Sequence, residues 1–431
     1  MKLSDLIDFN PKRPLEKGAL TPFIEMADLP EGERDVSGIG SRVFNGGSSK
    51  FKNGDTLFAR ITPCLENGKT AKVSGLPDNA VGHGSTEFIV MGAKDPGIDE
   101  DFVYYVARHP EFRAYAKGRM EGTSGRQRVS WQAIADYEIP DFSRLERSGI
   151  GSVLSSMDNL ISNNRRVNQA LETMARALFK AWFVDFEPVR AKLEGRWQRG
   201  QSLPGMPEHL YNLFPDRLAE SDLGKVPEGW LWVPASEVVE FNPTEPLRKG
   251  ALAPYLDMAA LPTSGSWPDL PALREFGSGM RFRNGDTLLA RITPCLENGK
   301  TAFVQGLPQG ALAWGSTEFI VLRPKAPVPA EYAYLLARDS AFREHAIRSM
   351  TGTSGRQRVQ ADSLAEFKVA SPLDAKIWKA FADFVTPHFK GIKANSEASQ
   401  TLAQLRDTLL PRLISGELRV PDAERIVGAA V

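Results

Sequence analysis

The alternation of apolar and polar positions predicts a mixed domain at the start of the chain. Short apolar or β-branched runs, bounded by Asn-Gly, Gly-Asp and Pro, predict strands at 57–61, 88–91 and 137–140. Apolar residues at helical spacing predict a helix over 101–118, which Pro110 kinks or splits because proline lacks the N–H that a helix needs.

From residue 150 the apolar positions change to a seven-residue repeat, which predicts a long helix with a coiled-coil seam. One seam position holds Ile150, Met157, Asn164, Leu171 and Leu178, and the other holds Val153, Leu160, Val167, Met174 and Ala181. A polar residue such as Asn164 within a seam fixes register at some cost in stability. The repeat ends at AWFVDFEPV (181–189), whose aromatic residues either dock a partner or pack on their own domain.

The chain carries one module twice. FKNGDTLFARITPCLENGKTA (51–71) returns 231 positions later as FRNGDTLLARITPCLENGKTA (282–302). GSTEFIV, from Gly84, returns from Gly315, and GTSGRQRV, from Gly122, returns from Gly352. An offset of this size indicates a duplicated domain and not a short solenoid repeat. A protein with the same surface twice is expected to bind something twice.

A second long helix, predicted from about residue 375 to 415, carries Asn395 at the same offset from Asn164. Matching asparagines are expected if the two helices pair, and two helices that each follow a globular domain most simply pair antiparallel, with pseudo-two-fold symmetry. The residues predicted to pair the helices are Asn164, Leu171, Leu178, Asn395, Leu402 and Leu409.

These patterns predict an α+β protein in which two similar mixed α/β domains are separated by two long antiparallel helices. The predicted divisions are a first domain at 1–143, a helix at 144–188, a linker rich in Pro, Gly and charge at 189–229, a second domain at 230–373, a helix at 374–416 and a tail at 417–431.

Composition narrows the class of protein. A chain of 431 residues is too long to fold around a single hydrophobic core. Its 53 basic residues equal its 53 acidic residues in number, so any basic surface must be local. Two cysteines at equivalent places are not a disulfide framework, and no run of about 18 apolar residues occurs. We expect a cytoplasmic protein without membrane association.

Enzymatic interpretations find little support in the sequence. Gly68-Lys69-Thr70 is similar to the end of a phosphate-binding loop, but Pro63 stands where that loop needs glycine. Asp78 and His83 are replaced by Gln309 and Trp314 in the second copy, and the five histidines lack zinc spacing. We therefore expect no catalytic, cofactor-binding or metal-binding residues.

Nucleic-acid binding is the better-supported interpretation of the repeated loops. Arginine reaches guanine O6 and N7, glutamine reaches adenine N6 and N7, and hydroxyl groups suit phosphates. The alternatives are a solvated GTSGRQRV loop in which one arginine pairs with a carboxylate, and a GSTEF turn in which Glu87 forms an internal salt bridge. The candidate DNA-binding residues are Lys69, Ser85, Thr86, Ser124, Arg126, Gln127 and Arg128 with their counterparts Lys300, Ser316, Thr317, Ser354, Arg356, Gln357 and Arg358.

Over essentially its full length the chain resembles the specificity (S) subunit of type I restriction-modification systems. The segments that carry the resemblance are GDTLFARITPCLENGK with GSTEF in each copy, NRRVNQALETMARALFKAWFVDFEPVRAK, VPEGW and TLLPRLISGELRV. The resemblance implies two target-recognition domains that read a split site in double-stranded DNA. It also implies two methyltransferase (M) subunits and restriction (R) subunits as partners, which would carry S-adenosylmethionine, ATP and Mg²⁺.

Two expectations refine this resemblance. Family members commonly join dissimilar domains, whereas these are close copies, so we expect an interrupted, near-palindromic site whose halves differ through 31–50 and 263–281. Helices of about 35 residues would act as a ruler of roughly 50 Å. The alternatives are a scaffold that grips two copies of a protein, and a stand-alone restriction or methylation enzyme with fused recognition domains.

Overall fold

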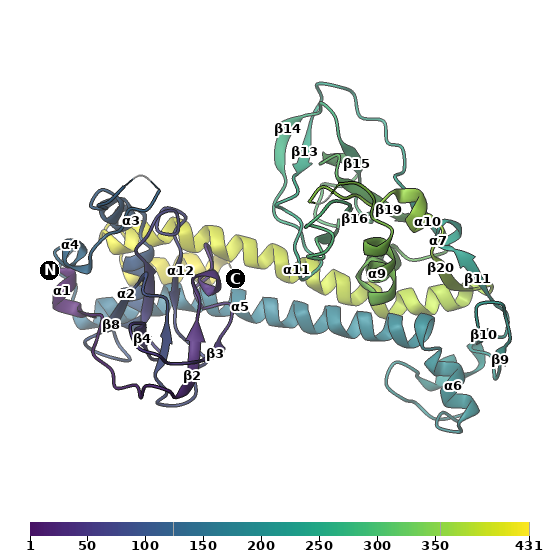
Figure 1. Ribbon diagram of the computed structural model, residues 1–431, viewed down its shortest axis with the longest axis horizontal. Helices are drawn as coiled ribbons and strands as arrows, with labels where there is room; N and C mark the ends of the chain where they lie inside the picture. The colour runs from purple at the N-terminus through teal and green to yellow at the C-terminus, as the bar shows by residue number, and fades with distance from the viewer. Residues whose placement is uncertain (124, 354, 431) are drawn as a thin grey trace. The chain divides into compact units, whose positions relative to one another are not determined.

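The computed structural model describes every residue except Ser124, Ser354 and Val431 and divides into two compact units (Figure 1). The first unit comprises Met1–Asn163 and Ala398–Val431, and the second comprises Asn164–Glu397. The boundary falls inside both long helices, α5 (Arg144–Phe179) and α11 (Ala375–Ile414). The predicted class, two mixed α/β domains with two long helices, is confirmed.

Two four-stranded sheets form the β part of the first unit. The first, antiparallel throughout, has the order β1 (Ile7–Phe9), β8 (Phe88–Ala93), β5 (Thr56–Ala59) and β6 (Thr70–Lys72). The second has the order β3 (Gly40–Val43), β2 (Leu20–Ile24), β7 (Gly82–Gly84) and β4 (Ser49–Phe51). In the second sheet β2 and β7 run parallel. All four residues of the edge strand β3 are exposed.

The helices of this unit are α1 (Leu3–Leu6), α2 (Glu100–Arg108), α3 (Pro110–Lys117), α4 (Trp131–Ala135) and α12 (Val420–Ala430), with a 3₁₀ turn η1 (Met26–Asp28). The predicted split at Pro110 is confirmed, since α2 ends at Arg108 and Pro110 opens α3. Proline is well placed there, because the first residue of a helix has no intrahelical acceptor for its N–H.

The second unit repeats both sheets in the same strand order, as the duplicated sequence predicts. One sheet has the order β12 (Val239–Phe241), β19 (Phe319–Pro324), β16 (Thr287–Ala290) and β17 (Thr301–Phe303). The other has the order β14 (Ala272–Glu275), β13 (Leu252–Leu256), β18 (Ala313–Gly315) and β15 (Met280–Phe282). Its shorter helices are α7 (Ala235–Val238), α8 (Ala330–Arg338), α9 (Ser340–Arg348) and α10 (Ala361–Ala365).

The strand predicted at 137–140 is wrong. In the second unit the equivalent residues do form a strand, β20 (Lys368–Pro372), which pairs along its length with β11 (Trp230–Pro234). In the first unit this segment pairs with residues 1–3 instead: a single bridge joins Lys2 to Glu138, the Leu3 N–H donates to the Tyr137 carbonyl (3.0 Å), and the Ile139 N–H donates to the Met1 carbonyl (3.0 Å). This pairing is too short to form a strand.

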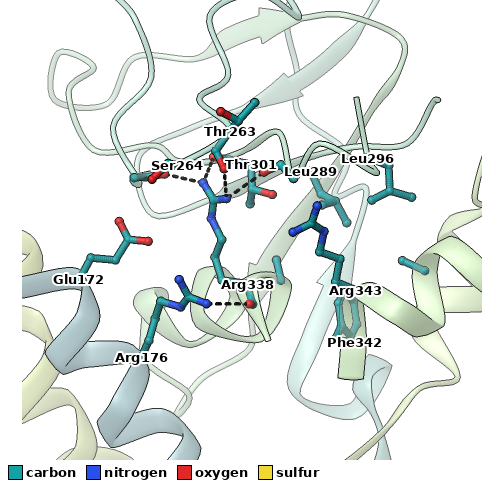
Figure 2. A pocket seen from close by; sticks show the side chains of 14 residues that line it. Glu172, Arg176, Thr263, Ser264, Leu289, Leu296, Thr301, Arg338, Phe342 and Arg343 are labelled. Carbon is teal, nitrogen blue, oxygen red and sulfur yellow. Dashed lines mark hydrogen bonds between the residues drawn. The ribbon is translucent and has the colours of Figure 1, made fainter. Parts of the chain in front are cut away.

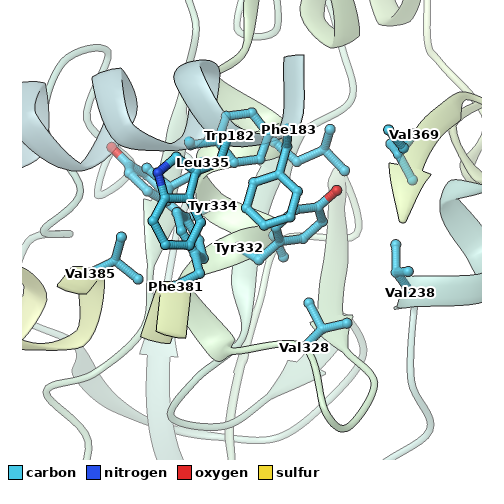
Figure 3. Close-up of a cluster of buried hydrophobic side chains, with 14 of the residues drawn as sticks. Trp182, Phe183, Val238, Val328, Tyr332, Tyr334, Leu335, Val369, Phe381 and Val385 are labelled. Carbon is cyan, nitrogen blue, oxygen red and sulfur yellow. The ribbon is translucent and has the colours of Figure 1, made fainter. Parts of the chain in front are cut away.

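The segment between α5 and β11 is an ordered part of the second unit. It contains a π-helical turn η2 (Lys180–Val184), α6 (Glu187–Leu193), a 3₁₀ turn η3 (Glu208–Leu213) and a short ladder of β9 (Leu218–Ala219) with β10 (Val226–Pro227). Trp182 and Phe183 are buried in a cluster with Tyr332 and Phe381 (Figure 3). Trp197 is 1% exposed and joins the same core. The aromatic segment therefore packs on its own unit.

The predicted seam of α5 is correct at the first position and mostly wrong at the second. Val153 is buried as predicted, but Leu160, Val167 and Met174 are 40%, 40% and 58% exposed. The side that is buried instead lies four residues after the first position and holds Leu154, Ile161 and Ala175. A seven-residue repeat allows two spacings of the apolar positions: three residues and then four, or four residues and then three. The residues that pack on α5 show that its buried side follows the second spacing.

Polar contacts pair the two helices within each unit. In the second unit Asn395 Nδ2 donates to Asn168 Oδ1 (2.9 Å), and Asn168 Nδ2 donates to Ser396 Oγ (3.1 Å). A longer bond joins Asn164 Nδ2 to the Asn395 carbonyl (3.4 Å), while Leu171 packs on the core. Within this unit the helices are antiparallel, because Leu171, later on α5, lies against Gly391, earlier on α11, and Trp182 packs on Phe381, earlier still.

In the first unit the helices share a buried ion pair. Arg406 on α11 and Asp158 on α5 are 2% and 4% exposed and are hydrogen-bonded to each other. Tyr105 Oη also donates to Asp158 (2.5 Å). Burial, aided by this carboxylate, raises the pKa of Tyr105 well above its usual 10.0, so the phenol stays a donor. Among the helices that the structure describes, none has the length and apolar content to cross a membrane.

Candidate functional site

Three repeated segments meet in each unit and form what we call the loop cluster. In the first unit it consists of residues 60–64, 85–87 and 125–128. Backbone hydrogen bonds join the segments: Arg60 N–H donates to the Glu87 carbonyl (3.0 Å), and Thr62 N–H donates to the Gln127 carbonyl (3.0 Å). The sequence places these segments far apart, and the fold makes them one surface.

Hydroxyl side chains stabilise the turns of the loop cluster. The Gln127 N–H donates to Thr62 Oγ1 (3.1 Å), and the Glu87 N–H donates to Ser85 Oγ (3.1 Å). Thr86, between Ser85 and Glu87, is exposed. Ser85 therefore has a structural role in the GSTEF turn, whereas the Thr86 hydroxyl faces solvent.

Arg128 forms an ion pair with Glu87. Its Nε and Nη2 donate to the carboxylate at 2.9 and 2.6 Å. The hydrogen bonds that Arg128 donates to Glu87 raise the pKa of Arg128 above its usual value. Both alternatives that the sequence left open, an arginine paired with a carboxylate and Glu87 in an internal salt bridge, are thus realised in one contact. Arg128 joins the GTSGRQRV loop to the GSTEF turn.

Arg126 has a different environment. Its side chain is exposed, and within the described part of the chain its guanidinium has no hydrogen-bond or ion-pair partner. Its backbone closes a turn onto the Thr123 carbonyl (3.0 Å). Gly122 has φ +123°, and a Cβ there would lie 3.1 Å from the Arg126 carbonyl. Glycine is needed for this close turn, which presents Arg126 to solvent.

The loop cluster of the second unit has the same geometry. It consists of residues 291–295, 316–318 and 355–358. Arg358 Nη2 lies 2.6 Å from Glu318, and its hydrogen bond lowers the pKa of that carboxyl. Arg356 is exposed like Arg126, and Gln357 N–H donates to Thr293 Oγ1 (3.1 Å). The candidates Ser316 and Thr317 stand where Ser85 and Thr86 stand, and the Glu318 N–H donates to Ser316 Oγ (3.1 Å).

Two other candidates, Lys69 and Lys300, lie outside the loop clusters. Lys69 donates to the Met26 carbonyl (3.0 Å), and Lys300 donates to the Met258 carbonyl (2.7 Å). Each amine thus already binds its own domain. Ser124 and Ser354 lie outside the described residues.

The candidates did not include the arginines that open the ITPC segments. The Nε atoms of Arg60 and Arg291 are buried and have no hydrogen-bond partner among the described residues. Arg291 also donates from Nη2 to Gln360 (2.6 Å), where the first copy has Ser130. The sequence did contain a signal for these two residues, because both copies keep an arginine directly before the shared Ile-Thr-Pro-Cys.

The copies differ on the second sheet of each unit, next to the edge strands β3 and β14. Arg42 on β3 lies over the Phe23 ring, with Cζ 3.9 Å from its centroid, and His83 packs on the same ring. In the second unit Arg274 lies 4.4 Å from the Tyr255 centroid, and Trp314 replaces the histidine. The architecture is shared, while the exposed residues of the edge strands differ: they are Gly-Ser-Arg-Val in β3 and Ala-Leu-Arg-Glu in β14.

Groups of three or more His, Cys, Asp or Glu side chains that could hold a metal are absent from the described residues. The fold and the two sites define a class of protein with two equivalent loop clusters that contain arginine. Each loop cluster belongs to its own unit with two sheets.

Comparisons with known proteins agree with one family. The specificity subunit of the type I restriction enzyme MjaIX, from Methanocaldococcus jannaschii, is 24% identical over 343 residues, covering 76% of this chain and 71% of the relative. The specificity subunit of the HindI enzyme, from Haemophilus influenzae, is 22% identical over 409 residues, covering 85% and 87%. No family model matches the chain.

A solved structure supports the same fold. The S subunit of a type I restriction-modification system from M. genitalium superposes with a TM-score of 0.54 at 15% identity, covering 96% of this chain and 95% of that chain. The resemblance seen in the sequence is thus confirmed: the chain is similar to type I restriction enzyme specificity subunits over most of its length.

Proposed function

We propose that this chain is the non-catalytic specificity subunit of a type I restriction-modification complex, and that each unit reads one half of a bipartite DNA site. One observation carries the proposal: the same hydrogen-bonded loop cluster, with one exposed arginine, occurs in both units of a chain related to such subunits. A single cluster would be an ordinary surface loop, whereas two equivalent clusters match a split site.

The chemistry of the loop cluster suits a base reader. The exposed guanidinium of Arg126 or Arg356 can reach guanine O6 and N7, and the neighbouring glutamine side chain can reach adenine N6 and N7. Arg128 and Arg358 hold the loop through their glutamates and position these readers. Thr86 and Thr317 offer exposed hydroxyls for phosphate oxygens.

Partners follow from the same proposal. Two methyltransferase subunits would supply S-adenosylmethionine chemistry, and restriction subunits would supply ATP- and Mg²⁺-dependent chemistry, in the cytoplasm. The net charge of zero is consistent with this division, because basic partners can provide most of the salt-dependent phosphate contacts.

The two half-sites are expected to be related in sequence. Similar readers under pseudo-two-fold symmetry give an interrupted palindrome or a site close to one. The sheet faces beside β3 and β14, where His83 and Trp314 differ, are where the two halves would diverge.

A methylation map tests the proposal. The chain is co-expressed with its methyltransferase, and the DNA is sequenced by a method that detects N6-methyladenine. A split, near-palindromic motif is the expected result. A split motif with unrelated halves would keep the subunit assignment and reject the symmetry argument. A soluble complex that methylates nothing would favour the protein scaffold.

A further inference from the structure

The second unit contains a small cavity, apart from its loop cluster, that three arginines line (Figure 2). Arg176 comes from α5, Arg338 ends α8 and Arg343 belongs to α9. The cavity has a volume of about 140 Å³, and Thr263 and Ser264 also border it. This is smaller than the roughly 300–1,000 Å³ of drug-sized ligand sites, so it suits a single small group.

Arg338 builds the wall of this cavity. Its Nη1 donates to the carbonyls of Thr263 (3.0 Å) and Gly299 (2.8 Å), and its Nη2 donates to that of Thr301 (3.0 Å). Its Nε donates to Tyr334 Oη (3.0 Å). These bonds use the donors of the guanidinium but leave its positive charge at the cavity.

Arg343 and Arg176 retain donors for a ligand. Arg343 Nη2 donates to the Glu297 carbonyl, but its Nε is buried and has no partner among the described residues. Arg176 is exposed, and its bond to the Arg338 carbonyl is long at 3.5 Å. A buried guanidinium N–H without an acceptor is unfavourable, so an acceptor that enters the cavity gains a charge-assisted hydrogen bond.

The charge of the cavity favours an anion. Glu172 is the acidic residue that lines it, and this carboxylate accepts a hydrogen bond from Tyr334 Oη (2.7 Å). Three guanidinium groups face one carboxylate, which leaves an excess of positive charge in a partly enclosed space. Coulomb interactions are stronger there than in bulk water.

The first unit supplies a natural comparison. Its equivalent cavity is lined by Arg108 and Arg113, the counterparts of Arg338 and Arg343. Asp407 on α11 occupies the place of Arg176 and lies 3.5 Å from Arg108. Glu31 lines this cavity too, so two carboxylates balance two arginines. The duplication has therefore kept the cavity in both units but made only one of them electropositive.

We propose that the Arg176–Arg338–Arg343 cavity binds a phosphate group, carried by a free ligand or by the DNA backbone. Arginine forks and hydroxyl groups are the donors that phosphate oxygens prefer. The site is separate from base reading by the loop cluster, so the phosphate measurement does not depend on the proposed function.

Inorganic phosphate titrated into the full chain at constant ionic strength tests the proposal, with calorimetry as the readout. We expect saturable binding that Arg176→Asp weakens about tenfold or more, because one charge-assisted contact is replaced by repulsion. Arg166→Asp is the matched control, since Arg166 is exposed on the same helix outside the cavity lining. No binding, or equal loss in both variants, would overturn the proposal.

Glu172→Gln provides the opposite change. It keeps an acceptor for Tyr334 Oη and removes the negative charge, so phosphate should bind more tightly; weaker or unchanged binding would contradict the site.

The source of the phosphate group is identified by testing whether inorganic phosphate competes with a DNA duplex. Phosphate that weakens DNA binding by the wild type but not by Arg176→Asp identifies the backbone as the ligand. Phosphate binding with unaltered DNA binding identifies a free phosphate-bearing ligand.

Discussion

In each loop cluster, two arginines two positions apart have opposite roles. Arg128 is held by Glu87, whereas Arg126 is exposed without a partner among the described residues. The sequence treats them alike, because both belong to GRQRV and both recur in the second copy. Only the folding of the GSTEF turn against this loop separates the arginine that pairs with Glu87 from the arginine that is exposed.

Replacing the exposed arginine should reduce DNA affinity without reducing stability. We expect Arg126→Ala in the assembled complex to weaken binding by about 1–3 kcal/mol and to relax the sequence preference of one half-site. Arg356→Ala should do the same for the other half. Fluorescence anisotropy with duplexes mutated in either half measures this, and thermal unfolding serves as the control. Unchanged affinity in both variants would remove these arginines from the interface.

The Glu318–Arg358 pair should give the second unit a small acid sensitivity. Because the folded-state pKa of Glu318 lies below its usual 4.5, the pair stabilises the fold above about pH 4.5 and the contribution is lost as pH falls through the lower folded value. At pH 7, Glu318→Gln should lower the free energy of unfolding by up to about 1 kcal/mol, as for a partly exposed pair. Below pH 4.5 the difference from the wild type should shrink.

Denaturant unfolding as a function of pH measures this effect. Glu366→Gln is a matched control, since Glu366 is exposed and forms no ion pair within the described residues. A constant difference between Glu318→Gln and the wild type at all pH values would show that the carboxylate charge contributes nothing.

At the scale of elements, polar contacts determine how the long helices pair. In the second unit an asparagine layer joins Asn168 to Asn395, and in the first the Arg406–Asp158 pair is buried. Matching asparagines at 164 and 395 correctly suggested pairing, but the partner with the better geometry is Asn168, one helical turn further on. Buried polar groups need good geometry, so they specify one register more strongly than leucines do.

Removal of one member of the buried pair should destabilise the first unit strongly. Arg406→Ala leaves Asp158 buried without its ion-pair partner, and a loss of about 3–5 kcal/mol in the free energy of unfolding is expected. The double variant Asp158→Leu, Arg406→Met should recover most of this loss, because it leaves no buried charge. Chemical denaturation measures both. A loss below 1 kcal/mol in the single variant would mean that water replaces the partner.

At the scale of the whole molecule, the helices α5 and α11 each run through both units, and each unit carries one loop cluster. Under the proposed function, helix length and the unread gap in the DNA site should be coupled. Removing one heptad from each helix shortens the connection by about 10 Å, close to three base pairs.

The gap in the methylated motif is therefore expected to shrink by about three base pairs, while the two half-sites keep their bases. Methylation mapping of the shortened variant gives the answer, and the full-length chain is the reference. A shortened variant that reads new bases with an unchanged gap would show that the helices do not set the spacing.

The sequence by itself determined the duplicated α+β architecture, the two long helices and the segments that form the loop cluster. A near-verbatim repeat must fold twice in the same way, and heptad periodicity has few interpretations other than a long helix. Pro110 was likewise sufficient to predict the break between two helices, because proline lacks the backbone N–H whatever the position of the rest of the chain.

Tertiary structure decided what depends on a partner distant in sequence. Residues 137–140 form no strand because they meet only residues 1–3, through a single bridge, and Leu160 and Met174 are exposed because the other helical face is the one covered. Lys69 binds a backbone carbonyl, and Arg176 lies where Asp407 lies in the other unit. Each of these outcomes depends on which groups meet in space, and a periodic pattern along one chain does not contain that information.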